Sequence, residues 1–82
     1  MEEKRLAVLS VIVRDRTVTE RLNACLSEYG EYIVGRMGIP YREKGVSVLS
    51  IVLDAPASAL NALTGKIGML PGVSAKALFS KI

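Results

Sequence analysis

Two short segments of the sequence carry the side chains best suited to binding a charged ligand. Asp15, Arg16 and Thr17 follow an apolar run and precede a helical pattern. We therefore expect them at a helix start, where backbone N–H groups help to hold an anion. Arg36 stands between two glycines, and its planar guanidinium group can grip an anion through paired hydrogen bonds. These four side chains are our candidate ligand-binding residues.

Both segments also have structural interpretations that need no ligand. Asp15 to Thr17 can cap the helix and leave their charges in solvent. Gly35 to Tyr41 can form an irregular edge strand, because glycines inside a strand often mark a bulge and Pro40 would block further pairing. We favour the structural interpretation for both segments, and for the second because a single arginine has low specificity.

The rest of the sequence offers little chemistry for catalysis. Histidine is absent, which removes the commonest proton shuttle at neutral pH and the commonest nitrogen ligand of metals. Cys25 is the only cysteine and falls on an apolar helical stripe, so we interpret it as a core residue. Thr64-Gly65-Lys66 lacks the preceding glycine of a phosphate-binding loop. We expect a non-enzymatic protein with no catalytic residue, metal or cofactor.

The composition predicts a cytoplasmic protein that associates with itself. Half of the residues are hydrophobic and the mean hydropathy is +0.34, which is apolar for so short a chain. The uncharged run Val46 to Leu53 is far shorter than the ~20 residues of a membrane-spanning helix, so a second subunit explains the apolar composition better than a membrane. A lone cysteine, which cannot form an internal disulfide, suits a reducing compartment.

The charge balance leaves a second class of function open. The chain has 11 Lys and Arg against 8 Asp and Glu, a net charge of +3, and the basic residues are scattered. The alternative function is therefore a DNA-binding transcriptional regulator, or an RNA-binding one. The sequence shows no helix-turn-helix, zinc finger or basic arm, and binding of this kind should collapse with added salt.

The elements that must position these residues are predicted to form two similar halves. Val8 to Val13 and Val48 to Leu53 correspond position by position, including a serine, which indicates an internal duplication of a strand. The first strand leads into a helix that should begin at a capping box, Thr17 to Glu20, and end at a left-handed Gly30. The second leads into a helix that should open at Asp54 to Pro56.

The remaining segments complete a known arrangement of strands and helices. Tyr32 to Pro40 and Val73 to Phe79 are expected as strands, and Arg42 to Gly45 as a polar turn. Right-handed crossovers then place the first and third strands in the centre, with both helices on one face. The prediction is a single α+β domain over residues 1–82, a ferredoxin-like βαββαβ sandwich with a four-stranded antiparallel sheet of order 4-1-3-2.

Alternation along the two central strands separates a covered face from an open one. The side chains expected beneath the helices are Leu9, Val11, Val13, Leu49, Ile51 and Leu53. The opposite face carries Val8, Ser10, Ile12, Val48, Ser50 and Val52. An exposed aliphatic patch of this kind usually marks an interface. We predict a homodimer or homotetramer formed through this face or a sheet edge. The alternative is that a long loop or the N-terminus covers the patch, but no segment is long enough.

Two parts of the sequence resemble known regulatory families. Leu70 to Lys76, with a Pro-Gly-Val turn into the last strand, resembles ACT-type regulatory domains and the sensing domain of nickel-responsive repressors. Asn23 to Tyr41, and the chain onward through Lys66, resembles more closely the family described as regulators of the iron-only hydrogenase system. The resemblance implies an oligomer that responds to a small-molecule effector or a protein partner.

Two functions of these relatives are not carried over to this chain. ACT domains that bind amino acids have a glycine-bearing Asp-x-Pro-Gly loop after the first strand, and here that loop is Arg14 to Thr17, without glycine. The nickel repressors bind metal through histidines, which this sequence lacks. Amino-acid sensing and nickel binding are therefore not expected.

Overall fold

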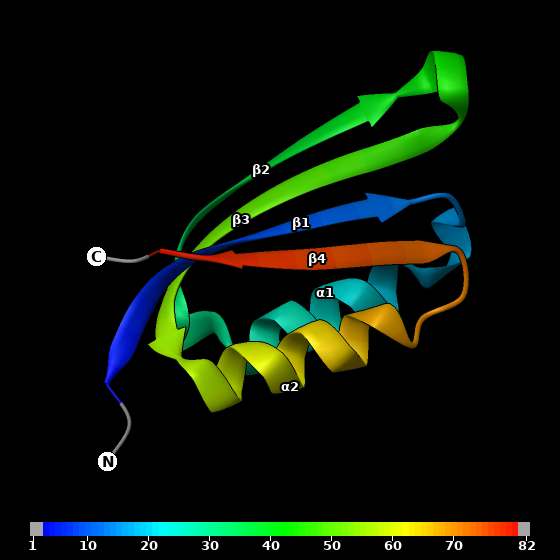
Figure 1. Cartoon of the computed structure of the whole chain (residues 1–82). Coiled ribbons are helices and arrows are strands. Elements are labelled where there is room, and N and C mark those ends of the chain that lie inside the picture. Colours follow the sequence, from blue (N-terminus) through cyan, green and yellow to red (C-terminus); the bar gives the residue numbers. More distant parts are fainter. Residues whose placement is uncertain (1–2, 81–82) are drawn as a thin grey trace.

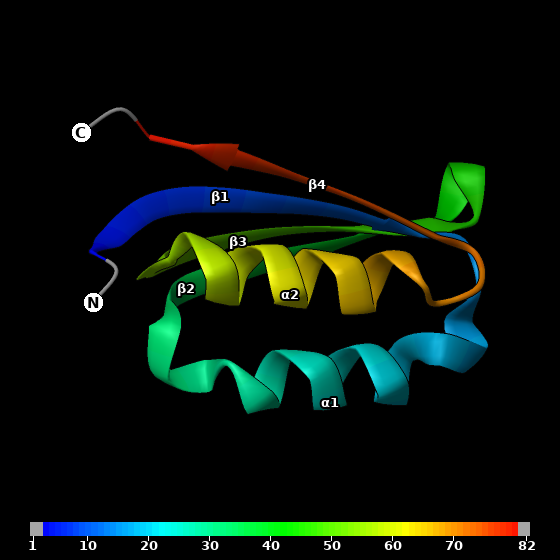
Figure 2. The ribbon, with the colours of Figure 1, turned by 60° about the horizontal axis from the view of Figure 1, so that its bottom comes forward.

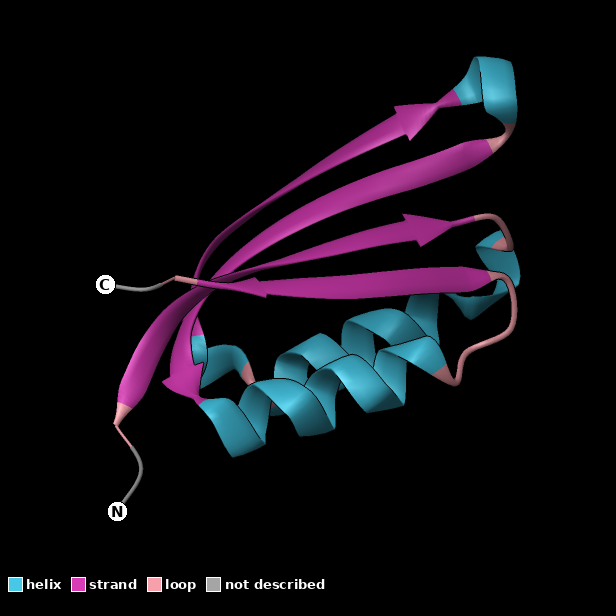
Figure 3. Cartoon of the chain, viewed as in Figure 1, coloured by secondary structure: helices cyan, strands magenta, loops and turns pink. Residues whose placement is uncertain are grey.

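The computed structural model describes residues 3–80, which follow the order βαββαβ (Figure 1). The strands are β1 (Lys4–Val13), β2 (Ile33–Tyr41), β3 (Val46–Pro56) and β4 (Val73–Phe79), and the helices are α1 (Thr19–Glu28) and α2 (Ala57–Gly68). Short 3-10 turns, η1 (Arg16–Val18), η2 (Gly30–Tyr32) and η3 (Arg42–Lys44), lie at the joins between these elements (Figure 3).

The strands form one four-stranded antiparallel sheet with the order β2-β3-β1-β4. This is the predicted order 4-1-3-2 read from the other edge, so the α+β ferredoxin-like arrangement is confirmed. Both helices lie against the same face of the sheet (Figure 2). The described residues place no element over the other face.

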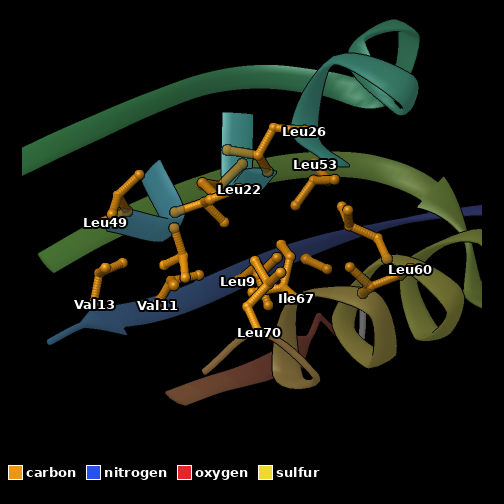
Figure 4. Packing of buried hydrophobic residues seen from close by; sticks show 14 residues of the cluster. Leu9, Val11, Val13, Leu22, Leu26, Leu49, Leu53, Leu60, Ile67 and Leu70 are labelled. Carbon is orange, nitrogen blue, oxygen red and sulfur yellow. The ribbon is translucent and has the colours of Figure 1, made fainter. Parts of the chain in front are cut away.

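The core lies between the helices and the central strands (Figure 4). Leu22 and Leu26 of α1 and Leu60 and Ile67 of α2 are each at most 2% exposed. All six side chains that the alternation assigned to the covered face are buried, as predicted: Leu9, Val11, Val13, Leu49, Ile51 and Leu53. Burying a side chain of this size contributes about 1.5–3 kcal/mol, so this layer dominates the stability of the fold.

The start of α1 differs from the predicted capping box. Asp15 Oδ1 accepts hydrogen bonds from the Thr17 backbone N–H at 2.9 Å and from the Thr17 hydroxyl at 2.6 Å. The threonine hydroxyl is therefore engaged upstream, the chain makes the 3-10 turn η1, and α1 begins only at Thr19. The capping-box prediction is wrong because an aspartate two residues earlier takes over the capping role.

Two further boundaries were placed incorrectly by the sequence patterns. Asp54 to Pro56 ends β3 rather than opening α2, because β1 begins early enough for Arg5 to pair with Ala55, whose side chain is buried. Gly30 begins η2 and has no left-handed conformation; within residues 3–80, only Gly45 and Gly72 have positive φ.

Gly72 holds the turn before β4 against the loop that follows β1. Its φ is +69°, and a Cβ added there would lie 2.7 Å from the Cβ of Asp15. The Arg14 N–H donates to the Gly72 carbonyl at 2.7 Å, which joins the same two segments. Only glycine suits both the backbone conformation and this close approach.

We predict that Gly72→Ala destabilises the protein more than Gly45→Ala does. Gly45 also has a left-handed φ, of +64°, but nothing lies within 4 Å of its would-be Cβ. Gly45→Ala should therefore lower the free energy of unfolding by only about 1–2 kcal/mol, the cost of a left-handed backbone at alanine. Gly72→Ala has the same cost and adds a clash with Asp15. Urea unfolding of both variants measures the difference, and equal losses would contradict the close approach.

Candidate ligand cavity and open sheet face

A bulge near the start of β2 decides which way its side chains point. Ile33 pairs with Leu53 and Gly35 with Val52, so Val34 is an extra residue without a partner on β3. Because side chains alternate along a strand, this insertion reverses the facing of every residue that follows. Without the bulge, Arg36 would lie on the open face.

Beyond the bulge, the helix-facing positions of β2 carry no large apolar side chain. They are Arg36, Gly38 and Pro40, which pair with Ile51, Leu49 and Ser47. The space between this part of β2 and the first turns of α1 is consequently unfilled. A cavity of about 230 Å³ remains there.

The cavity has an apolar wall and a basic rim. Val13, Leu22 and Leu49, all buried in the core, contribute to its lining. The polar lining comes from Arg16 in η1, Thr19 and Asn23 in α1, Ser47 in β3 and Arg36 in β2. Arg36 Nη2 donates to Asn23 Oδ1 at 3.3 Å. None of the lining residues is acidic, so the site is positively charged.

The structure brings together two of the four candidate ligand residues. Arg16 and Arg36 line the same cavity from different elements, whereas Asp15 and Thr17 do not line it and bond to each other in the cap. The sequence patterns missed Asn23. Its spacing of four residues from Thr19 puts both on one face of α1, which is the signal that could have identified it.

The hydrogen bonds in the cap also act on the Asp15 carboxyl group. The Thr17 hydroxyl, and after it the Thr17 backbone N–H, stabilise the carboxylate and lower the pKa of Asp15. The carboxyl group is therefore a structural acceptor at neutral pH. Its role is to fix the loop that carries Arg16.

The open face is the sheet face opposite the helices. At its centre Ser10 pairs directly with Ser50, flanked by the pairs Val8–Val52 and Ile12–Val48. Ile12 is 44% and Val48 37% exposed, while Val8, Ser50 and Val52 are half-buried by their neighbours in the sheet. The patch extends beyond the predicted residues, because the register adds further exposed apolar side chains: Leu6, Met37, Ile39, Tyr41 and Leu78.

Metal ligands, membrane-spanning helices and free thiols are further features that could indicate a function. Within residues 3–80 no three or more Cys, Asp or Glu side chains cluster closely enough to hold a metal ion. No helix of that range has the length and apolar character needed to cross a membrane. Cys25 is a free thiol that packs against the core.

A family model described as "TM1266-like: Iron-only hydrogenase system regulator, putative" matches residues 5–77. The chain belongs to this family. Its membership confirms the family predicted from the sequence, and a family of regulators points to a protein that is not an enzyme. No curated protein matches the chain.

One solved structure supports this assignment, and others share the fold. Protein TM1266 from Thermotoga maritima is 35% identical, with a TM-score of 0.91 over 96% of this chain and 100% of that chain. The C-terminal domain of MgtC from Mycobacterium tuberculosis, 15% identical, has a TM-score of 0.70 over 99% of this chain and 93% of that one. A formyltetrahydrofolate deformylase from Pseudomonas putida, 14% identical, has a TM-score of 0.64 over 88% of this chain and 28% of that one. These last two share the fold alone.

The lowered pKa of Asp15 predicts an acid-dependent contribution to stability. A carboxyl group whose pKa is lower in the folded state stabilises the fold above its ordinary pKa, about 3.9, and loses that contribution as the pH falls through the lowered value. Asp15→Asn cannot titrate. The melting temperature of the wild type should therefore exceed that of the variant at neutral pH, and this difference in melting temperature (the gap) should narrow as the pH falls through the lowered pKa of Asp15. A gap that does not change with pH would contradict this role.

Proposed function

We propose that this protein is a cytoplasmic, non-enzymatic regulator of an iron-only hydrogenase system, which works as a homo-oligomer and responds to a small effector. The family supports the regulatory role. The self-association is carried by one observation, the uncovered apolar face of the sheet. Cys25, the only cysteine and a free thiol, suits the reducing cytoplasm.

The open face has the properties of a sheet-packing surface. Its centre is the small Ser10–Ser50 pair, and pairs of aliphatic side chains lie on both sides of it along the strands. Two sheets that pack face to face lie about 10 Å apart, and their side chains interdigitate. Small central residues permit that approach. Ile12 and Val48, each more than a third exposed in the single chain, would become buried, which favours association.

A second copy of the chain fits this face better than an unrelated partner. The duplicated segments pair antiparallel, so Val8 lies across from Val52 and Ile12 across from Val48 around the central serines. The two central strands of the face are thus nearly symmetric about the serine pair, whereas the outer strands differ, with Lys76 of β4 beside Ser10 and Met37 of β2 beside Ser50. A two-fold dimer requires a patch that is complementary to itself, and a patch with internal two-fold character meets this requirement.

We predict that Ile12→Lys converts an oligomeric wild type into a monomer. The lysine would place a charge in the middle of the packed sheets, where desolvation opposes association. Sedimentation velocity over a concentration series measures the mass. The wild type should sediment above the 8.8 kDa of one chain, and the variant at that mass.

Met69→Lys is the matched control for this experiment. Met69 is 85% exposed at the end of α2, away from the open face, so its substitution should leave the oligomer intact. Circular dichroism checks that both variants fold. A wild type that remains a single copy at high concentration would refute the proposed assembly.

A further inference from the structure

We infer that the cavity between α1 and β2 binds a small organic anion, with a carboxylate or phosphate head group and a short apolar body. The inference rests on the proposed function, since it names the class of effector that such a regulator would sense. Each part of this ligand corresponds to one part of the lining.

The basic rim is suited to the anionic head group. Within residues 3–80, neither Arg16 nor Arg36 forms an ion pair, whereas Lys66 is paired with Glu28 at 2.8 Å. The partner that Arg36 does have is the neutral Asn23 amide at 3.3 Å, a long hydrogen bond. A carboxylate or phosphate between the two arginines would form the shorter and stronger charge-assisted bonds that this arrangement lacks.

The inner wall is suited to an apolar body of limited size. Leu22 and Leu49 line it, and Gly38 opposite Leu49 contributes no side chain. A bare inorganic ion would leave this wall unfilled. At about 230 Å³, the cavity is below the ~300 Å³ at which pockets for drug-sized ligands begin, so it fits a small metabolite.

Two separate irregularities of β2 combine to make the cavity. The bulge at Val34 turns Arg36 toward α1, and Gly38 leaves the space behind it empty. A glycine inside a strand lowers the stability of that strand, and a bulge interrupts the ladder of hydrogen bonds. An edge strand needs neither for folding, and both irregularities lie beside the same cavity.

Calorimetric and NMR titrations of the full chain test this site. Hexanoate and butyl phosphate are the probes, hexanamide is the neutral control, and inorganic phosphate is the head group alone. We expect at least one probe to bind, and to bind about tenfold or more tightly than either control, because the charged and apolar contacts are both required. Tighter binding of one probe identifies the head group. Binding of hexanamide or inorganic phosphate equal to that of the tighter probe would overturn the inference.

Three variants locate the binding. Arg36→Gln should weaken it about tenfold or more, whereas Arg21→Gln, an arginine of α1 outside the cavity, should leave it unchanged. Gly38→Val fills the space: an added Cβ would lie 3.9 Å from Leu49 Cγ, an ordinary contact, so the fold should hold while binding is lost. Equal effects of Arg36→Gln and Arg21→Gln would overturn the inference.

Sedimentation in the same buffers separates this inference from the proposed assembly. An oligomer that binds neither probe refutes the ligand and leaves the assembly standing. A monomer that binds a probe, with the effects of Arg36→Gln and Gly38→Val described above, refutes the assembly and supports the cavity.

Discussion

The alternation of side chains along β1 and β3 is the constraint on which the rest of the structure depends. Two helices cover one face of a four-stranded sheet. Residues such as Leu9 and Ile51 point toward the helices and are fully buried. Ile12 and Val48, which are adjacent in sequence to buried residues, point to the other face and are exposed. Because the strands are apolar at successive positions, a fold with a single helical layer leaves half of that apolar surface without a partner.

The same alternation, broken once, creates the cavity. A strand that continued β2 without interruption would turn Met37 toward α1 and Arg36 toward the open face. The extra residue at Val34 reverses this, so the apolar side chain joins the open face and the charged one lines the cavity. One inserted residue therefore contributes to both surfaces on which the proposed regulation depends.

The sequence was sufficient for the fold and for the assignment of the two sheet faces. Apolar, β-branched runs such as Val8 to Val13 predict strands, and the alternation of side chains divides each run between the two sheet faces. The resemblance of Asn23 to Tyr41 led to the correct family. Helix ends were less predictable. Thr17 and Gly30 have the residue types of caps, but Asp15, two residues before Thr17, takes over the capping role, and Gly30 begins η2.

The cavity could be predicted only in part. Arg16 and Arg36 were candidates from their residue types, but nothing in a linear pattern shows that they line one space. That depends on the bulge position, which the glycines suggested without fixing its register. Leu49 was predicted correctly as a core residue, but its second role as a wall of the cavity follows only from the missing side chain at Gly38.

The most direct test of the central claim is the accessibility of methyl groups to a soluble paramagnetic agent, measured by NMR on the wild-type protein. If the open face is the interface, the methyl groups of Ile12 and Val48 will be shielded, whereas that of Met69 will relax strongly. Rapid relaxation of Ile12 and Val48, matching that of Met69, would show that the face is in water and would contradict the account.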